Sequence, residues 1–406
     1  MNRTLLIVTV ALLLKSASFC SVINVPADQP TIQAGIDAAK NGDTVLVAPG
    51  TYKENINFNG KAITVRSSNG AQATIIDGQG LTSAVMFSSN ETSTSVLGGF
   101  TIQNGNANNN PEGEGGGIAV ESASPTIKEN IIQNNLGSNG GGGIGLGFAS
   151  PLIERNTIRN NSQSPEVSGG IGGGGISVRG ASTAQIIGNV IEYNTWPTSA
   201  GGGLSLFAAG SVLVENNLFL GNTSSGEGTA ITMANDASGT VIAQNVFTGN
   251  NSTNGSTIFW WDSPAALVNN TITDGQTSTP GFGIVSAEGL SSSFVIANNL
   301  IVASNPATVA FDCVSGGIPN PANFYNNDVF NNQGAAYSEL CGDQTGSNGN
   351  ISADPLFVAK KNFRLNAGSP AINAGSISAP HLPSKDFANK PRIVDGTIDM
   401  GAYESQ

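Results

Sequence analysis

The chain has 406 residues and a net charge of −12, with 11% charged residues and 53 glycines. No basic stripe is present to neutralise phosphates, which argues against nucleic acid and anionic membranes as partners. The acidic balance also weighs against tight binding of a polyuronate, because such a polymer would approach a surface of its own sign.

The first 20 residues have the pattern of a secretory signal peptide. Arg3 supplies the positive end, residues 5–14 the apolar region, and residues 16–20 a cleavage context of small side chains. A single-span membrane anchor is the alternative, although the apolar run is short for one. We therefore expect an exported protein, secreted or at the cell surface, with no membrane insertion once the signal is removed.

Residues 21–60 are predicted to cover the N-terminal end of the fold. An amphipathic helix is expected over residues 31–40, with Pro30 at its start and Gly42 just past its end. Strands are expected at 22–25 and 44–48. A repetitive fold needs a cover for its first repeat, and this helix is well placed to provide it.

A repeated phrase organises residues 61–350. In each copy an Asn has an apolar residue three positions before it and another two positions after it, and copies recur about every 28 residues. A Gly-rich run followed by a short alternating segment accompanies most copies, as at residues 140–146. The repeated residues are Asn130, Asn156, Asn189, Asn217, Asn245, Asn270, Asn299 and Asn327.

This pattern predicts an all-β fold, a parallel β-helix with two strand phrases in each coil. Alternation places Ile144 and Leu146 on one face, and the equivalent residues of other copies are also apolar, so this face should line the inside. The recurring Asn would form an internal ladder of side-chain amides. A leucine-rich repeat has a similar length, but it needs Leu at fixed spacings and usually a helical return leg.

The entry stretch at residues 31–52 and the Gly-Gly-Gly-Ile phrases resemble secreted bacterial right-handed parallel β-helix proteins of the pectin-lyase-like superfamily. Residues 351–406, with Asp-Pro-Leu-Phe at 354–357 and Asp395 to Glu404, look like the closing segment of such surface or secreted proteins. The resemblance implies a right-handed coil with an N-terminal capping helix and an irregular C-terminal cap. It does not imply one activity, because the superfamily contains lyases, hydrolases, esterases, epimerases and non-catalytic adhesins.

Two cysteines share one position in successive copies. Cys313 and Cys341 each follow a repeated Asn, Asn299 and Asn327, by the same number of residues. Stacked coils would bring them within the distance that a disulfide accepts, and an exported protein can form one. The alternative is a pair of free thiols in loops.

Catalytic signatures are scarce. His381 is the single histidine and lies in the Pro-rich tail, so the repeats contain no Ser-His-Asp set and no Cys/His metal spacing. The resemblance implies that catalysis on this fold would use carboxylates, Arg or Lys. The chain matches neither the Asp motifs of polygalacturonases, nor the Ca²⁺-binding Asp cluster of pectate lyases, nor the Asp-Pro-His-Asp motif of alginate epimerases.

One group of residues is the candidate site. Four consecutive copies place an acid near the same strand edge, and two aromatic residues are expected to face outward beside it. Such carboxylates next to an exposed ring could bind a sugar by stacking and hydrogen bonds, or could bind Ca²⁺. Alternatively the acids merely occupy turns and the second aromatic packs under a loop. The group comprises Asp236, Asp262, Glu288 and Asp312, with Phe259 and Trp261.

The sequence therefore predicts an exported, monomeric and non-catalytic protein that binds an extracellular polysaccharide or surface glycan. No cofactor other than Ca²⁺ is suggested by these residues. The alternative is a polysaccharide-degrading enzyme, either a lyase or a hydrolase with a carboxylate pair, in which Asp236, Asp262 and Glu288 would be catalytic.

Overall fold

The computed structural model describes residues 20–110, 114–166, 172–198, 201–235, 239–252, 254–273, 276–277, 283–306 and 308–405. The predicted signal peptide, apart from its last residue, lies outside these ranges, and so does Asp236. Within the described residues, no helix has both the length and the apolar character needed to span a membrane.

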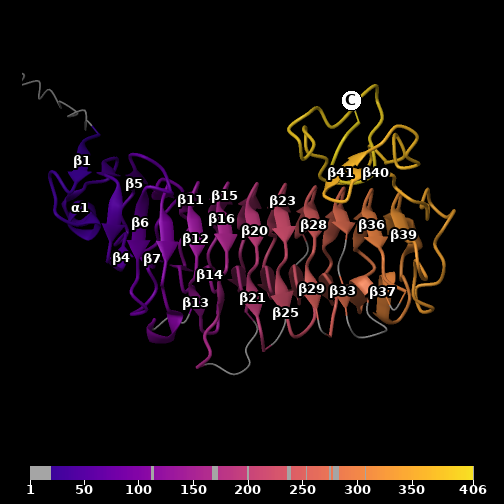
Figure 1. Ribbon diagram of the computed structural model, residues 1–406, viewed down its shortest axis with the longest axis horizontal. Helices are drawn as coiled ribbons and strands as arrows, with labels where there is room; N and C mark the ends of the chain where they lie inside the picture. The colour runs from indigo at the N-terminus through magenta and orange to yellow at the C-terminus, as the bar shows by residue number, and fades with distance from the viewer. Residues whose placement is uncertain are drawn as a thin grey trace, which may run out of the picture.

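The chain winds into a parallel β-helix whose walls are three long sheets and one short sheet (Figure 1). Sheet A contains β1 (Val22–Val25), β2 (Thr44–Val47), β5 (Thr64–Ser67), β8 (Val96–Gly98), β11 (Thr126–Lys128), β15 (Leu152–Glu154), β19 (Gln185–Ile187), β23 (Leu213–Glu215), β27 (Val241–Ala243), β31 (Ala266–Val268), β35 (Val295–Ala297) and β38 (Phe324–Tyr325).

Sheet B contains β3 (Gly50–Tyr52), β6 (Thr74–Asp77), β9 (Thr101–Gln103), β12 (Ile131–Gln133), β16 (Thr157–Arg159), β20 (Val190–Glu192), β24 (Leu218–Leu220), β28 (Val246–Thr248), β32 (Thr271–Thr273), β36 (Leu300–Ala303) and β39 (Asp328–Asn331). The short sheet D contains β13 (Leu136–Gly137), β17 (Ser162–Gln163), β21 (Thr195–Trp196), β25 (Thr223–Ser224), β29 (Asn251–Ser252) and β33 (Gln276–Thr277).

Sheet C contains β4 (Ile56–Asn57), β7 (Val85–Phe87), β10 (Ile118–Glu121), β14 (Ile144–Gly147), β18 (Ile176–Arg179), β22 (Leu204–Phe207), β26 (Ile231–Ala234), β30 (Ile258–Trp261), β34 (Gly283–Glu288) and β37 (Val309–Ser315). Single 3-10 turns lie at Ala107–Asn109 and Pro321–Asn323.

The predicted fold class is confirmed, and each coil proves to have more strands than expected. The Asn phrase is two strands, one in sheet A and one in sheet B, joined at a sharp corner. At the corner before Asn130, the backbone of Glu129 adopts the left-handed conformation (φ 57°). The expected amide ladder is present: the Asn189 side chain donates to Asn217 Oδ1 over 3.0 Å, and Asn217 donates to Asn245 in the same way.

A second amide ladder follows five residues later. The side chain of Asn161 donates to Asn194 Oδ1 over 3.0 Å, and Asn194 donates to Asn222 over the same distance. The Gly-rich runs also stack on one another. A Cβ atom on Gly174 would lie 2.5 Å from the carbonyl oxygen of Gly202, so no side chain fits between adjacent runs.

The predicted disulfide is confirmed. Cys313 and Cys341 are bonded, with 5.3 Å between their Cα atoms and a sequence separation of 28 residues. Cys313 pairs with Ala287 of β34 and therefore belongs to the inward column of sheet C.

The N-terminal end is covered by α1 (Ile32–Ala38), whose N-cap Thr31 accepts a hydrogen bond from the Ala34 N–H. Ile32 and Ile36 are fully buried in the same core as the coils, as expected of a capping helix. Sheet A begins at β1, so strands of the solenoid already occur within the segment that we assigned to the cap.

The C-terminal segment, residues 351–405, lies against the outer sides of sheets A and B over the last coils (Figure 1). Its only sheet among the described residues is the antiparallel hairpin of β40 (Phe357–Ala359) and β41 (Asn362–Leu365). Arg392 is fully buried within the segment and donates to the carbonyl oxygens of Asp399 and Gly401, beside Glu404 at 3.7 Å. The segment is fixed to the coil corners, for example by the Ser376 N–H donating to Asn298 Oδ1 over 2.7 Å.

Candidate functional site

The predicted site lies on the outward side of sheet C, where β30 and β34 pair in parallel. The register sets Trp261 beside Glu288 and Phe259 beside Ser286. Both aromatic residues point away from the bore, as predicted, but their exposure differs. Trp261 is 43% exposed, whereas Phe259 is only 4% exposed and contributes no open surface.

The described acids of this group do not occupy equivalent positions on their strands. The structure pairs Ile258 with Val285 and not with the neighbouring Ile284. Because Ile284 and Val285 are both apolar and buried, alternation alone could not show which of them begins the inward column. Glu288 therefore aligns with Trp261, and Asp262 lies one residue further along its strand.

Asp312 belongs to the covered column rather than to the exposed edge. It pairs with Ser286, which itself pairs with Phe259, and it is 6% exposed. Burial raises the pKa of its carboxyl group, and hydrogen bonds from Ser338 and Ser286 partly offset this effect. These contacts give Asp312 a structural role, and it is not available to a ligand from outside.

One acid of this region, Glu227, was not predicted from the sequence. Glu227 belongs to the loop before β26, which folds back over the outer face, so that the Thr232 hydroxyl donates to the Glu227 carbonyl over 2.9 Å. Burial raises the pKa of the Glu227 carboxyl, and the charge of Glu288 raises it further. Only the fold-back of a Gly-rich loop brings Glu227 to this outer face of the coil.

We call Glu227, Trp261, Asp262 and Glu288 the sheet C surface. Asp262 is exposed and left-handed (φ 42°), and its N–H donates to the Glu288 carbonyl over 3.0 Å. Within the described residues, none of the three carboxylates has a Lys, Arg or His partner within 4 Å. Nor do any three His, Cys, Asp or Glu side chains of the described ranges form a group able to hold a metal ion.

Two further side chains of this face extend the surface toward the N-terminus. Phe148 follows β14 and is 67% exposed, with its ring over Gly180, where an added Cβ would lie 2.6 Å from the ring. Arg179 ends β18 and is half-buried. Its pKa is lowered by burial, and the charge of Glu114 opposes that shift.

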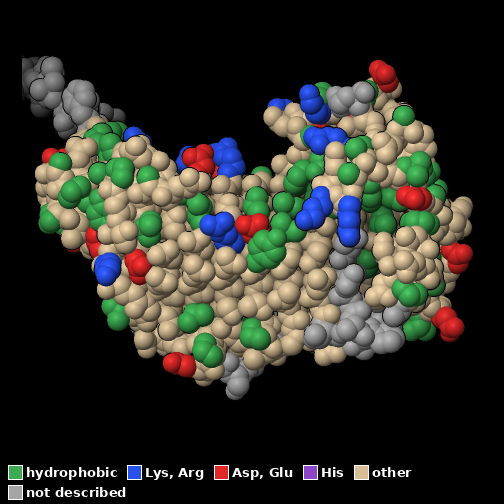
Figure 2. All heavy atoms as spheres, in the orientation of Figure 1, with side chains coloured by type: hydrophobic (Ala, Val, Ile, Leu, Met, Phe, Trp, Pro, Cys, Tyr) green, Lys and Arg blue, Asp and Glu red, His purple; other side chains and the backbone are tan. Residues whose placement is uncertain are grey.

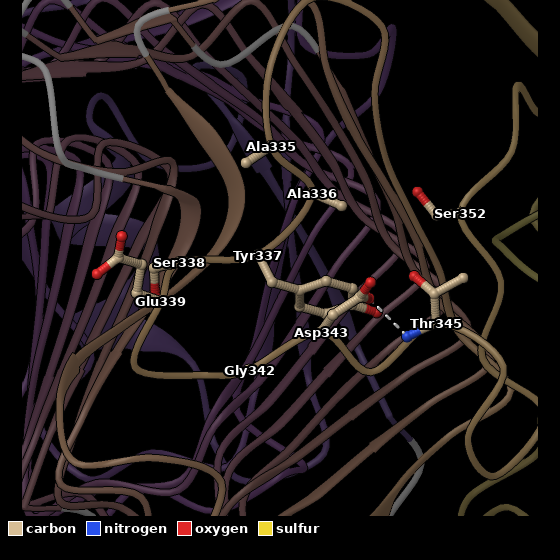
Figure 3. Close-up of a pocket in the computed structure, with 9 residues that line it drawn as sticks. All are labelled: Ala335, Ala336, Tyr337, Ser338, Glu339, Gly342, Asp343, Thr345 and Ser352. Carbon is tan, nitrogen blue, oxygen red and sulfur yellow. Dashed lines mark hydrogen bonds between the residues drawn. The ribbon is translucent and has the colours of Figure 1, made fainter.

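A separate hollow of about 560 Å³ lies at the C-terminal end of the coil (Figure 3). The Tyr337 side chain lines this hollow, and its backbone forms a β-bridge with Phe311 of β37. The Thr345 N–H donates to Asp343 Oδ1 over 2.9 Å. Burial and the nearby charge of Asp343 raise the pKa of the tyrosine hydroxyl. The Tyr337 ring meets that of Phe324 edge to face, with 6.1 Å between the ring centres, and so belongs to the apolar core of the coil.

Comparison with known proteins gives only distant likenesses among solved structures. A search of curated proteins finds no match. Among solved structures, pectate lyase Pel9A is 15% identical, with 92% of this chain and 90% of that chain covered and a TM-score of 0.40. The PL6 family alginate lyase AlyGC is 14% identical, with 95% and 59% covered and a TM-score of 0.47. The Azotobacter vinelandii mannuronan C-5 epimerase AlgE6 A-module is 15% identical, with 80% and 94% covered and a TM-score of 0.34.

The family model described as "Right handed beta helix region" matches residues 51–219 and 174–351, which together make up most of the chain. This match agrees with the stacked parallel sheets and with the right-handed coil that the sequence resemblance implies. The chain belongs to the right-handed β-helix family.

Proposed function

We propose that this protein is exported and binds an extracellular glycan along the sheet C surface without catalysing a reaction. The observation that carries the proposal is the exposed ring of Trp261, set beside Glu288 and followed by Asp262, with no cation paired to either acid in the described part of the chain. A pyranose can stack on such a ring while its hydroxyls donate to the flanking carboxylates.

The charge of the surface favours a neutral glycan. Glu227, Asp262 and Glu288 would repel the carboxylates of a polyuronate, whereas the hydroxyl groups of a neutral sugar are good donors to them. Phe148 lies on the same face four strands away from β30, which corresponds to about 19 Å at the ordinary strand spacing. Two exposed rings on one face suit a polymer that lies along the axis of the coil.

A glycan array followed by titration calorimetry with the best neutral glycan would test the proposal. Trp261→Ala is expected to weaken binding about tenfold, because a desolvated ring contact contributes on the order of 1 kcal/mol or more. Leu81→Ala is the matched control, since Leu81 is similarly exposed (57%) but belongs to an early coil. Equal affinity of the Trp261→Ala variant and the wild type would refute the proposal.

A carboxylate-pair hydrolase is the second candidate, and the presence of Glu227 on the same outer face as Glu288 is the observation in its favour. Glycosidases use a carboxylic acid with a raised pKa together with a second carboxyl group, and burial raises the pKa of Glu227. Incubation with neutral glucans and measurement of reducing ends separates the two functions. Release of reducing ends that disappears in Glu227→Gln and in Glu288→Gln would establish the hydrolase.

A further inference from the structure

A groove on another side of the molecule has the opposite chemical character. It lies where the C-terminal segment meets sheet B and has a volume of about 520 Å³, within the range of saccharide-sized sites. Its lining includes Tyr193, Leu218, Leu220, Lys360, Lys361 and Phe363. Figure 2 shows this side, with basic side chains beside apolar ones at the foot of the C-terminal segment. We propose that this groove binds an acidic saccharide.

The two lysines lie at the tip of the β40–β41 hairpin. They form the whole turn between β40 and β41, because Ala359 pairs with Asn362. Below them Phe363 is 6% exposed and packs with Val246 and Ala402. Two-residue hairpin turns favour Asn or Gly, so a Lys-Lys turn is not explained by turn preference. Both lysines are exposed, and among the described residues neither has a carboxylate within 4 Å.

Tyr193 provides a flat ring on the other side of the groove. Its backbone is left-handed (φ 53°), which is unfavourable for an aromatic residue, and the equivalent corners before and after it hold Asn160 and Gly221. Because the next corner is glycine, the ring can lie down over it: a Cβ on Gly221 would be 2.6 Å from the Tyr193 ring. The side chain is 54% exposed and is held open toward the groove.

This combination matches an acidic sugar better than other ligands. A pyranose face can pack on Tyr193 and on the half-buried Leu218 and Leu220, while its carboxylate approaches the two ammonium groups. The lining residues include no carboxylate that would repel it. A nucleic acid would need a longer basic track than two lysines, and it would meet a protein of net charge −12. The net negative charge of the chain, which disfavours polyuronate binding, is therefore not representative of the local charge in this groove.

Titration calorimetry of the mature protein with tetragalacturonate tests the inference, and the fully methyl-esterified tetramer serves as the uncharged counterpart. The acid should bind and the ester should bind at least about tenfold more weakly, with the difference shrinking at high salt. Lys360→Gln/Lys361→Gln should weaken binding of the acid about tenfold, and Tyr193→Asn should weaken both tetramers. Asn is a safe replacement, since it occupies the same corner at positions 134 and 160.

Two controls distinguish this groove from other surfaces. Lys385→Gln/Lys390→Gln removes two exposed lysines of the same segment and should leave affinity unchanged. Trp261→Ala alters only the sheet C surface and should also leave it unchanged, so the two proposed sites can fail separately. The inference is overturned if the acid does not bind at millimolar concentration or if the ester binds equally well. It is also overturned if the control lysines matter as much, or if a single-stranded tetranucleotide binds more tightly.

Discussion

The inside of the coil and its outer faces are built on different principles. Inside, each rung repeats the residue types of the last, such as Ile118, Ile144 and Ile176 in one column of sheet C and Asn189, Asn217 and Asn245 at one corner. Outside, the informative residues occur once each: Trp261 on sheet C and Tyr193 beside sheet B. Stability is therefore spread over many equivalent contacts, whereas binding depends on a few unrepeated side chains.

Two adjacent tryptophans give the most direct test of this difference. Trp260 is fully buried in the bore, and Trp261 next to it is 43% exposed. Trp260→Ala should lower the free energy of unfolding by about 3 to 5 kcal/mol, while Trp261→Ala should lower it by less than about 1 kcal/mol. Chemical denaturation of both variants measures this. Similar decreases in the free energy of unfolding of the two variants would contradict the idea that stability depends on the interior and binding on the surface.

The disulfide tests whether the interior of the last coils needs more than repeated packing. Removing it with Cys313→Ala/Cys341→Ala should destabilise these coils by about 3 to 4 kcal/mol, as expected for a closed loop of 28 residues. Hydrogen exchange should rise in β37 and around residue 341 and stay unchanged near β14. A reductant should reproduce the effect in the wild type and have no further effect on the variant.

Within the amide ladder, the contribution of one rung can be measured. Asn217 Oδ1 accepts from the backbone N–H and the side chain of Asn189, and Asn217 Nδ2 donates to the Ile186 carbonyl. Asn217→Ala removes the acceptor of the buried Asn189 N–H and the donor to the Ile186 carbonyl, and should cost about 2 to 4 kcal/mol. Asn216→Gly is the control, because residue 216 is left-handed (φ 58°) and glycine adopts that conformation freely, so its loss should be near zero.

In the last strand of sheet B an acid occupies an outward position that is apolar in the strand before it, and this makes the stability of the fold depend on pH. Asp328 aligns with Leu300 of β36, and burial raises its pKa to about 7. A raised pKa means that the folded state holds the proton more tightly, so this stabilisation is present at low pH and is lost as the pH rises toward 7. Between pH 5 and pH 8 the loss should be about 2 to 3 kcal/mol.

Thermal unfolding at several pH values checks the role of Asp328. The Asp328→Asn variant keeps an acceptor for the Ala353 N–H, which donates to Asp328 Oδ1 over 3.0 Å, and removes the titration. Its stability should exceed that of the wild type at pH 8 and should vary less with pH. A wild-type profile that is flat from pH 5 to pH 8 would show that Asp328 stays ionised in the fold.

The sequence was sufficient for the features that repeat. The Asn spacing predicted the ladder, and the shared phase of Cys313 and Cys341 predicted their bond, because stacking turns equal positions into neighbours. It was insufficient where repetition is interrupted. With Ile284 and Val285 both apolar, alternation could not fix the register that aligns Glu288 with Trp261.

The remaining features of the two proposed sites depend on contacts between residues that do not repeat along the sequence. Glu227 reaches the outer face only because its loop folds back over β26. The groove beside Tyr193 exists only because the C-terminal segment packs on sheet B. The resemblance implied a C-terminal cap but did not indicate which sheets the segment would contact. Net charge is an average over the chain, so it could not reveal an acidic surface and a basic groove in one molecule.

The direction of the amide ladder has a consequence for how such a protein can change in length. From Asn130 to Asn327, each Asn of the ladder donates to the side-chain oxygen of the Asn in the next coil, and the ladder ends at Asn350, which accepts from Asn327. Duplication of one entire coil would create a seam with the same donors and acceptors as any other. An insertion of half a coil would set an apolar side chain against an amide, so growth of the molecule by internal duplication should occur in units of one turn.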